Sequence, residues 1–126
     1  MKSAAKTQEI IGAAMEVHNW LGPGFIESIY QNSLMRELAS RGLYAQTEVP
    51  VDIVFKEVIV GRHRLDMLVD RCVIVELKAV AAIADIHKAQ LLSYLKATQM
   101  EVGIILNFGE TSLKWRRMVW SRGLRG

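Results

Sequence analysis

Two neighbouring stretches of the sequence carry charged residues inside apolar runs. VIVELKAV, at residues 73–80, contains Glu76 and Lys78, and RLDMLVD, at residues 64–70, contains Asp66. Side chains of a β-strand alternate between its two faces, so Glu76 and Lys78 share a face. Charged groups are rarely buried unless they are paired or bind an ion. The two acids are therefore candidates for a cation-binding site on a sheet, with Lys78 beside it.

The turn between the two stretches decides how closely Asp66 approaches Glu76. A three-residue turn centred on Arg71 places them directly opposite, whereas a two-residue turn pairs Asp66 with Val75 and turns Glu76 to the other face. Two adjacent carboxylates repel unless a proton or cation lies between them, and oxygen ligands favour Mg²⁺ or Mn²⁺ over zinc. A lysine beside such a metal could orient or deprotonate an attacking water. The alternative is a structural ion pair on a half-exposed sheet.

Polar residues at helical spacing could extend this site. In GFIESIY, on a helix expected from about residue 24 to 40, one face carries Gly24, Glu27 and Tyr30. On a helix expected from about residue 83 to 98, one face carries His87, Gln90 and Tyr94. Glu27 could instead serve only the helix dipole, and the second set could be the polar face of an ordinary amphipathic helix.

The elements that position these residues follow from periodicity and turn residues. Apolar residues at three- and four-residue spacing predict a first helix from about residue 4 to 21, and the glycines and proline of LGPG, residues 21–24, separate it from the second. Pro50 suggests an edge strand or a bulge. Strands are expected at residues 43–55, 58–69, 72–80, 101–108 and 112–120, with turns at Lys56-Glu57 and Asp70-Arg71. The order ααβββαββ favours a mixed α/β fold.

The composition indicates one packed domain spanning residues 1–126, because 51% of the residues are hydrophobic and only two are proline. A net charge of +3 is compatible with nucleic-acid binding. The single cysteine excludes an intrachain disulfide and a cysteine zinc cluster. The N-terminal residues do not resemble a signal peptide and no apolar run reaches membrane-spanning length, so we expect a cytoplasmic protein without membrane association.

The C-terminal residues combine basic and aromatic side chains. Such a surface can follow a phosphate backbone and stack a base, or it can be the solvated face of an edge strand anchored by tryptophans. Arg62 and Arg64, on either side of His63, could add positive potential. The C-terminal residues concerned are Lys114, Trp115, Arg116, Arg117, Trp120, Arg122 and Arg125.

In this order, the motifs resemble those of the PD-(D/E)XK nuclease superfamily. The matching residues are Glu27 on a leading helix, Asp66 on a strand, Glu76-x-Lys78 on the next strand, and Gln90-xxx-Tyr94 on the following helix, as in the RecB-like branch. GFIESIY is similar to the motif that names the GxxExxY protein family, whose members are small bacterial and archaeal proteins of that superfamily. The resemblance covers about residues 5–120, although Leu65 stands where the superfamily's name has proline.

The resemblance implies an α/β, restriction-endonuclease-like fold. Its αβββαβ core has a mixed central sheet flanked by helices, and this chain adds an N-terminal helix and a C-terminal strand. It also implies a Mg²⁺- or Mn²⁺-dependent nuclease that cleaves DNA, or alternatively RNA, with a homodimer or a partner chain completing the substrate surface. Holliday-junction resolvases of this superfamily act as dimers, so branched DNA is one candidate substrate.

The resemblance also implies roles for individual residues. Asp66 and Glu76 would hold the metal, and Glu27 would add a carboxylate directly or through water. Lys78 would act on the nucleophile, and Gln90 and Tyr94 would support the site. The expected substrate contacts are Tyr30, His87, Arg116 and Arg117. The alternative is a module that keeps the nuclease fold without catalysis and binds nucleic acid or a partner protein.

Overall fold

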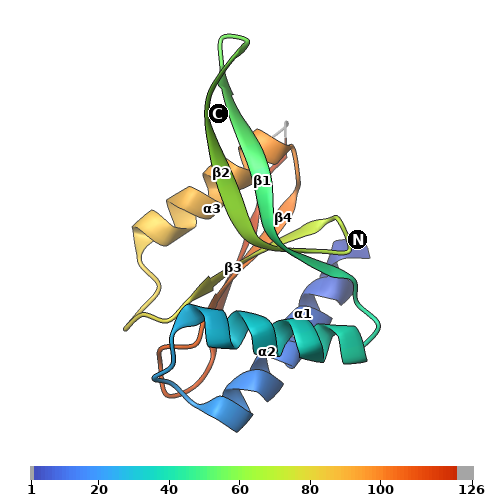
Figure 1. Cartoon of the computed structure of the whole chain (residues 1–126), viewed down its shortest axis with the longest axis vertical. Helices are drawn as coiled ribbons and strands as arrows, with labels where there is room; N and C mark the ends of the chain where they lie inside the picture. Colours follow the sequence, from blue (N-terminus) through green and yellow to red (C-terminus); the bar gives the residue numbers. More distant parts are fainter. Residues whose placement is uncertain (1, 122–126) are drawn as a thin grey trace.

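The computed structural model describes residues 2–121, in which helices cover both faces of a five-stranded sheet (Figure 1). Arg122 and Arg125 lie outside the described residues. Within residues 2–121, no helix combines the length and the apolar character needed to cross a membrane. The elements are α1 (Lys2–Leu21), α2 (Glu27–Ser40), β1 (Ala45–Phe55), β2 (Val58–Val69), β3 (Val73–Lys78), α3 (Asp85–Thr98), β4 (Val102–Asn107) and β5 (Lys114–Val119).

The sheet is mixed, with the strands in the order β1-β2-β3-β4-β5. Only β3 and β4 run parallel, and α3 provides the crossover that a parallel pair requires. Helices α1 and α2 pack on one face and α3 packs on the other. Pro50 lies in the edge strand β1, as expected. The expected α/β fold is confirmed, with an αβββαβ core, an added N-terminal helix and an added C-terminal strand.

The central strands β3 and β4 are buried on both faces. Every residue of β4 is buried, and in β3 only Lys78 is partly exposed, which explains their nearly continuous Val, Ile and Leu content. Gly103 of β4 lets α3 approach closely, because a Cβ at this position would lie 2.7 Å from Cδ1 of the buried Leu91. Helix α3 is therefore held tightly over one face of the parallel pair.

The second helix begins at Glu27, about three residues later than expected. Gly24 has a φ of +114°, a conformation outside the helical region. The Tyr30 hydroxyl holds this turn by donating to the carbonyl oxygen of Gly22 at 2.6 Å and accepting from the backbone N–H of Phe25 at 3.2 Å. Gly24 therefore does not share a helix face with Glu27 and Tyr30.

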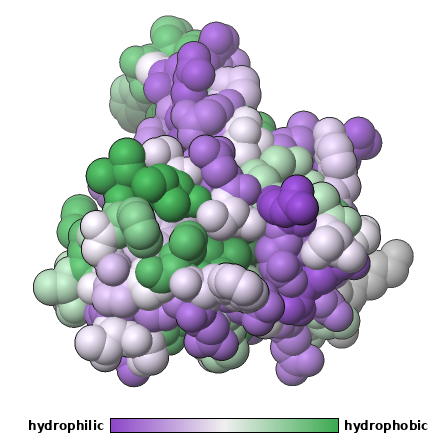
Figure 2. Space-filling view, turned by 60° about the horizontal axis from the view of Figure 1, so that its bottom comes forward, coloured by the Kyte–Doolittle hydropathy of each residue, from purple (hydrophilic) through white to green (hydrophobic). Residues whose placement is uncertain are grey.

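Strands β1 and β2 form a ribbon that extends beyond the rest of the sheet (Figure 1). β2 pairs with β1 over residues 58–69 but with β3 only at residues 67–69. We call residues 52–62, at the free end of this ribbon, the arm. Figure 2 shows apolar groups on the body of the protein and again at the end of the projecting arm.

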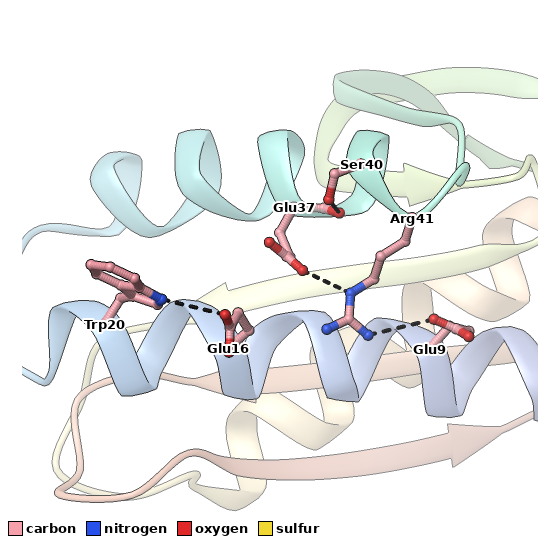
Figure 3. Close-up of polar contacts among 6 residues, drawn as sticks. All are labelled: Glu9, Glu16, Trp20, Glu37, Ser40 and Arg41. Atoms are coloured by element: carbon pink, nitrogen blue, oxygen red, sulfur yellow. Dashed lines mark hydrogen bonds and ion pairs between the residues drawn. The ribbon is translucent and has the colours of Figure 1, made fainter.

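Arg41 follows the last residue of α2 and joins this helix to α1 (Figure 3). Its Nε donates to Glu37 Oε2 at 2.8 Å, and its Nη1 lies 3.5 Å from Glu9 Oε2. Farther along α1, Trp20 Nε1 donates to Glu16 Oε2 at 3.3 Å. Of these three contacts, the Arg41–Glu9 pair joins the two helices, and exposed contacts of this kind contribute little energy each.

Candidate active site

The turn between β2 and β3 contains three residues. Met67 pairs with Val75 and Val69 pairs with Val73, which is the register that a turn centred on Arg71 requires. Asp70 and Arg71 both have positive φ, and the backbone N–H of residue 72 donates to the carbonyl of residue 69. Of the two registers considered, the structure has the one that directs Asp66 and Glu76 to a common site.

The regular alternation of side chains between the two faces of β2 is interrupted at Asp66. Leu65 lies in the core beneath α3 and Met67 lies in the core beneath α1 and α2, although residues two apart share a face in a regular strand. Glu48, across from Asp66 on β1, has a φ of +53°. Irregularities of this kind re-aim side chains and often occur near functional sites. Asp66 Oδ2 accepts a hydrogen bond from the backbone N–H of Leu77 at 2.9 Å, which holds the carboxylate against β3.

Glu76 is a buried acid with an unsatisfied oxygen. The residue is 7% exposed, and its Oε1 is buried without a hydrogen-bond partner. Burial first, then the charge of Asp66 and a hydrogen bond between the two carboxyl groups, raise the pKa of Glu76 to about 9, while the charge of Lys78 opposes this rise. A buried carboxyl with an unpaired oxygen is costly to stability, so a role outside folding is expected for it.

These residues line a pocket of about 220 Å³ between β2, β3 and α3. Asp66, Glu76 and Lys78 come from the two strands. The sequence-predicted residues of α3 that line it are His87, Gln90 and Tyr94. Six of the ten predicted site residues therefore lie around one pocket.

Aromatic side chains form one wall of the pocket. The rings of His63 and Tyr94 stack with their centroids 4.2 Å apart and their planes at 19°. Burial first, and then the charges of Glu76 and Asp66, raise the pKa of the Tyr94 hydroxyl, which keeps it protonated as a hydrogen-bond donor. His87 Nδ1 accepts from the backbone N–H of Ala84 at 2.9 Å, so the Nε2 of a neutral ring carries the proton.

A buried amide holds the backbone that follows Lys78. Asn107 is fully buried; its Oδ1 accepts from the N–H groups of Val80 at 3.0 Å and Gly109 at 3.1 Å. Its Nδ2 donates to the Val80 carbonyl and to Glu110 Oε2, both at 3.0 Å. The backbone N–H of Phe108, the residue after Asn107, donates to the Lys78 carbonyl at 2.8 Å. This network, which we call the Asn107 clasp, fixes the chain at the catalytic lysine candidate.

Glu27 and Tyr30 do not line the pocket. Tyr30 is fully buried, its hydroxyl is used within the 22–25 turn, and its ring stacks on Phe108 with centroids 4.6 Å apart. The expected role of Tyr30 as a substrate contact is therefore corrected to a structural one. Glu27 is exposed at the start of α2, one turn before Tyr30, and no group of three metal-binding side chains forms among residues 2–121.

Arg116 and Arg117 lie on β5, outside the pocket, and point to opposite faces of the sheet. Arg116 pairs with Ile105, whose side chain belongs to the α3 side, and Arg117 pairs with Ile104, whose side chain belongs to the α1 and α2 side. Both arginines are exposed. Only Arg116 therefore shares a face with the pocket.

Three residues of the site were not predicted from the sequence as catalytic, metal-binding or substrate-binding residues. His63 and Arg64 line the pocket from β2, and their only sequence signal was an alternation of basic residues beside Asp66. Asn107 had a weak signal, as an amide at the end of the apolar run VGIIL. Its role depends on the parallel pairing of Lys78 with Asn107, which joins residues far apart in sequence.

The donor set fits a hard divalent cation. Asp66 and Glu76 present carboxylates to one pocket, and the unpaired Glu76 Oε1 gives one such cation a ligand that the protein itself leaves unsatisfied. Mg²⁺ is usually held by one or two carboxylates together with waters and substrate phosphates, so two acids suffice. Asp66 and Glu76 would hold the ion, with Glu27 available only from outside the pocket.

A larger groove of about 790 Å³ lies between α1 and α2, lined among others by Trp20 and Arg36. None of the sequence-predicted site residues lines it. It lacks the convergent buried acids of the smaller pocket, so its size does not make it the candidate active site.

Comparisons with known proteins concern the family and the fold. Residues 4–118 match the family model of the PD-(D/E)XK nuclease superfamily. The crystal structure of SSO0001 has a similar fold, with a TM-score of 0.55 and 20% sequence identity over 75% of this chain and 50% of that chain. This chain thus spans about half the length of SSO0001, and at this identity the likeness concerns the fold alone. No curated protein sequence matched the chain significantly.

Proposed function

This chain belongs to the PD-(D/E)XK nuclease superfamily, and from that premise we propose that it is a metal-dependent nuclease that hydrolyses phosphodiester bonds in DNA, or alternatively RNA. One observation carries the proposal: the buried, unpaired Glu76 Oε1 lies in the same pocket as Asp66 and Lys78. A fold that needed these groups only for stability would pair each of them.

Each pocket residue has a task in this proposal. Asp66, held by the Leu77 N–H, and Glu76 bind Mg²⁺ or Mn²⁺, which supplies Lewis-acid chemistry to the scissile phosphate. Lys78 orients the attacking water and counters the negative charge that develops on the phosphate. His87 and Gln90 donate hydrogen bonds to the substrate backbone from α3. Tyr94 and His63 form a flat aromatic wall beside the scissile group.

Finer assignments are part of the same proposal. GFIESIY supports membership of the GxxExxY family, and Gln90-xxx-Tyr94 supports a relation to the RecB-like branch. Glu27 adds its carboxylate when substrate is bound, through a movement at the start of α2 or through water. We expect the protein to act on DNA in the cytoplasm, as a homodimer or with a partner chain.

One observation favours a second candidate function. The described residues do not bring Glu27 together with Asp66 and Glu76, as a three-carboxylate metal site would require. A module that retains the nuclease fold and binds nucleic acid or a partner protein without cleavage would tolerate this arrangement. Catalysis, rather than binding, therefore has to be measured.

The test is cleavage of end-labelled single-stranded, duplex and branched DNA with Mg²⁺, Mn²⁺ or EDTA. The wild type is compared with Lys78→Met and with Lys96→Met, a control on the exposed face of α3. We expect metal-dependent cleavage that Lys78→Met abolishes and Lys96→Met preserves, while calorimetry shows metal binding in all three. DNA binding without cleavage by the wild type would establish the binding module instead.

A further inference from the structure

The end of the arm exposes a set of large apolar side chains. Val54, Phe55, Val58, Ile59 and Val60 are each 59–62% exposed, and together with Lys56 and Glu57 they form what we call the arm tip. The cross-strand pairs Phe55–Val58 and Val54–Ile59 project to opposite faces, because neighbouring residues alternate along a strand. The arm tip is therefore apolar on both faces.

This arrangement is unfavourable for a free ribbon in water. An isolated two-stranded hairpin is marginally stable, and clustered exposed apolar groups mark a surface that another molecule covers. Val49, Val51 and Leu65, which adjoin the arm, pack in the core beneath α3, but the residues of the tip do not. The tip thus lacks a partner within the described chain.

The charges of the arm tip do not favour nucleic acid as its main partner. Lys56 and Glu57 are its only charged residues and cancel one another, whereas a phosphate-binding ribbon needs an excess of Lys or Arg. Both residues have positive φ, +49° and +69°, which is the backbone of a type I′ turn. Such turns favour Asn-Gly, so the Lys-Glu pair is not explained by turn formation alone.

We infer that the arm tip docks against the arm tip of a second copy of this chain. In a contact with twofold symmetry, Lys56 of each copy faces Glu57 of the other, which pairs both charges at once. The Lys56 ammonium lies 5.5 Å from the centre of the Phe55 ring, so the charge sits at the border of the apolar surface. Because the two cross-strand pairs project to opposite faces, such a contact buries one apolar face of each tip, which corresponds to a small interface of the weak, transient class.

The arm links the proposed contact to the pocket. The inference does not depend on the proposed function. His63 and Arg64, at the base of the arm, line the pocket, so a dimer through the arm tips would hold two pockets in a defined relation. The inference concerns association only, and it holds or fails whether or not the protein cleaves DNA.

The experiment is analytical ultracentrifugation of the full chain over roughly a hundredfold range of concentration. The variants are Lys56→Glu, Glu57→Lys and the double exchange, with Lys96→Glu as a charge control away from the arm tip. We expect a wild-type dimer, at least about tenfold weaker association in each single variant, and recovery in the double exchange. Phe55→Ser should weaken the dimer similarly, and circular dichroism should show every variant folded.

The outcomes separate cleanly. A wild type that stays monomeric throughout would overturn the inference, as would a dimer that none of the arm-tip variants weakens. A double exchange as weak as the single variants would overturn the reciprocal Lys56–Glu57 contact and with it the twofold docking. Recovery in the double exchange supports both.

Discussion

Asp66 takes the place of a backbone partner for Leu77: its Oδ2 accepts the Leu77 N–H at 2.9 Å where the pairing of β2 with β3 has already ended at Met67. A side chain thus continues a contact that the strand backbone no longer makes. The strands diverge at this point, and the carboxylate remains beside Glu76 in the space that opens. This hydrogen bond joins β2 to β3 beyond their last backbone pair, and it also positions the Asp66 carboxylate.

Substitutions of Asp66 should separate these two roles. Asp66→Asn keeps an oxygen that can accept from Leu77 but removes the charge, so we expect cleavage to fall about 100-fold or more with little loss of stability. Asp66→Ala loses the accepting oxygen as well as the charge, so the free energy of unfolding of this variant should fall by about 1–3 kcal/mol. Cleavage rates and urea denaturation measure the two effects. Equal destabilisation by both variants would argue against the hydrogen-bonding role.

Glu76 should make the stability of the metal-free protein depend on pH. Its folded-state pKa of about 9 exceeds the usual value of 4.5, so between these values the folded state binds more protons than the unfolded state. The unfolding free energy therefore decreases as pH rises through this window, by on the order of 3 kcal/mol between pH 4.5 and pH 7. Glu76→Gln should remove most of this slope. Denaturation in EDTA at pH 5 and pH 8 measures it, and an unchanged slope in the variant would contradict the assignment.

The Asn107 clasp should matter for both folding and catalysis. Asn107→Ala leaves the Val80 N–H and carbonyl and the Gly109 N–H without their partner, so we expect a loss of about 2–4 kcal/mol. Cleavage should fall more than DNA binding, because the backbone at Lys78 loosens. Asn32→Ala, at an exposed position of α2, is the control. Hydrogen exchange at the Val80 amide reports the clasp directly, and unchanged protection there would show that it is dispensable.

Tyr30 should behave as a structural residue. Tyr30→Phe removes the hydroxyl that binds Gly22 and Phe25, so the unfolding free energy should fall by about 1–2 kcal/mol. Tyr44→Phe should have little effect, because Tyr44 is 53% exposed. The KM for DNA should stay constant at a temperature where both variants are folded. A raised KM with unchanged stability would restore Tyr30 as a substrate contact.

Arg116 and Arg117 provide a matched pair on β5. Only Arg116 lies on the face of the sheet that carries the pocket, so Arg116→Ala should weaken DNA binding and reduce the slope of log K against log salt by about one. Arg117→Ala should leave both nearly unchanged. Fluorescence anisotropy over a range of salt concentrations compares them. Equal losses in the two variants would indicate a DNA path around the edge of β5.

The sequence by itself determined the elements and the local spacing of their polar residues. The strands and helices lie within a few residues of their expected bounds, because apolar periodicity and turn residues act over short stretches of chain. The shared face of Glu76 and Lys78 and the one-turn spacing of Gln90 and Tyr94 are also local consequences of strand and helix geometry. The superfamily motifs depend on the same local features.

Only the tertiary structure decided which residues meet. The three-residue turn and the interrupted alternation at Asp66 select one of two registers, and both depend on how each strand packs against its neighbours. Packing buries the ring of Tyr30 on Phe108, and strand pairing joins Asn107 to the chain after Lys78. Contacts between residues far apart in sequence arise only when the cores beneath α3 and beneath α1 and α2 form. For that reason spacing alone could not reveal them.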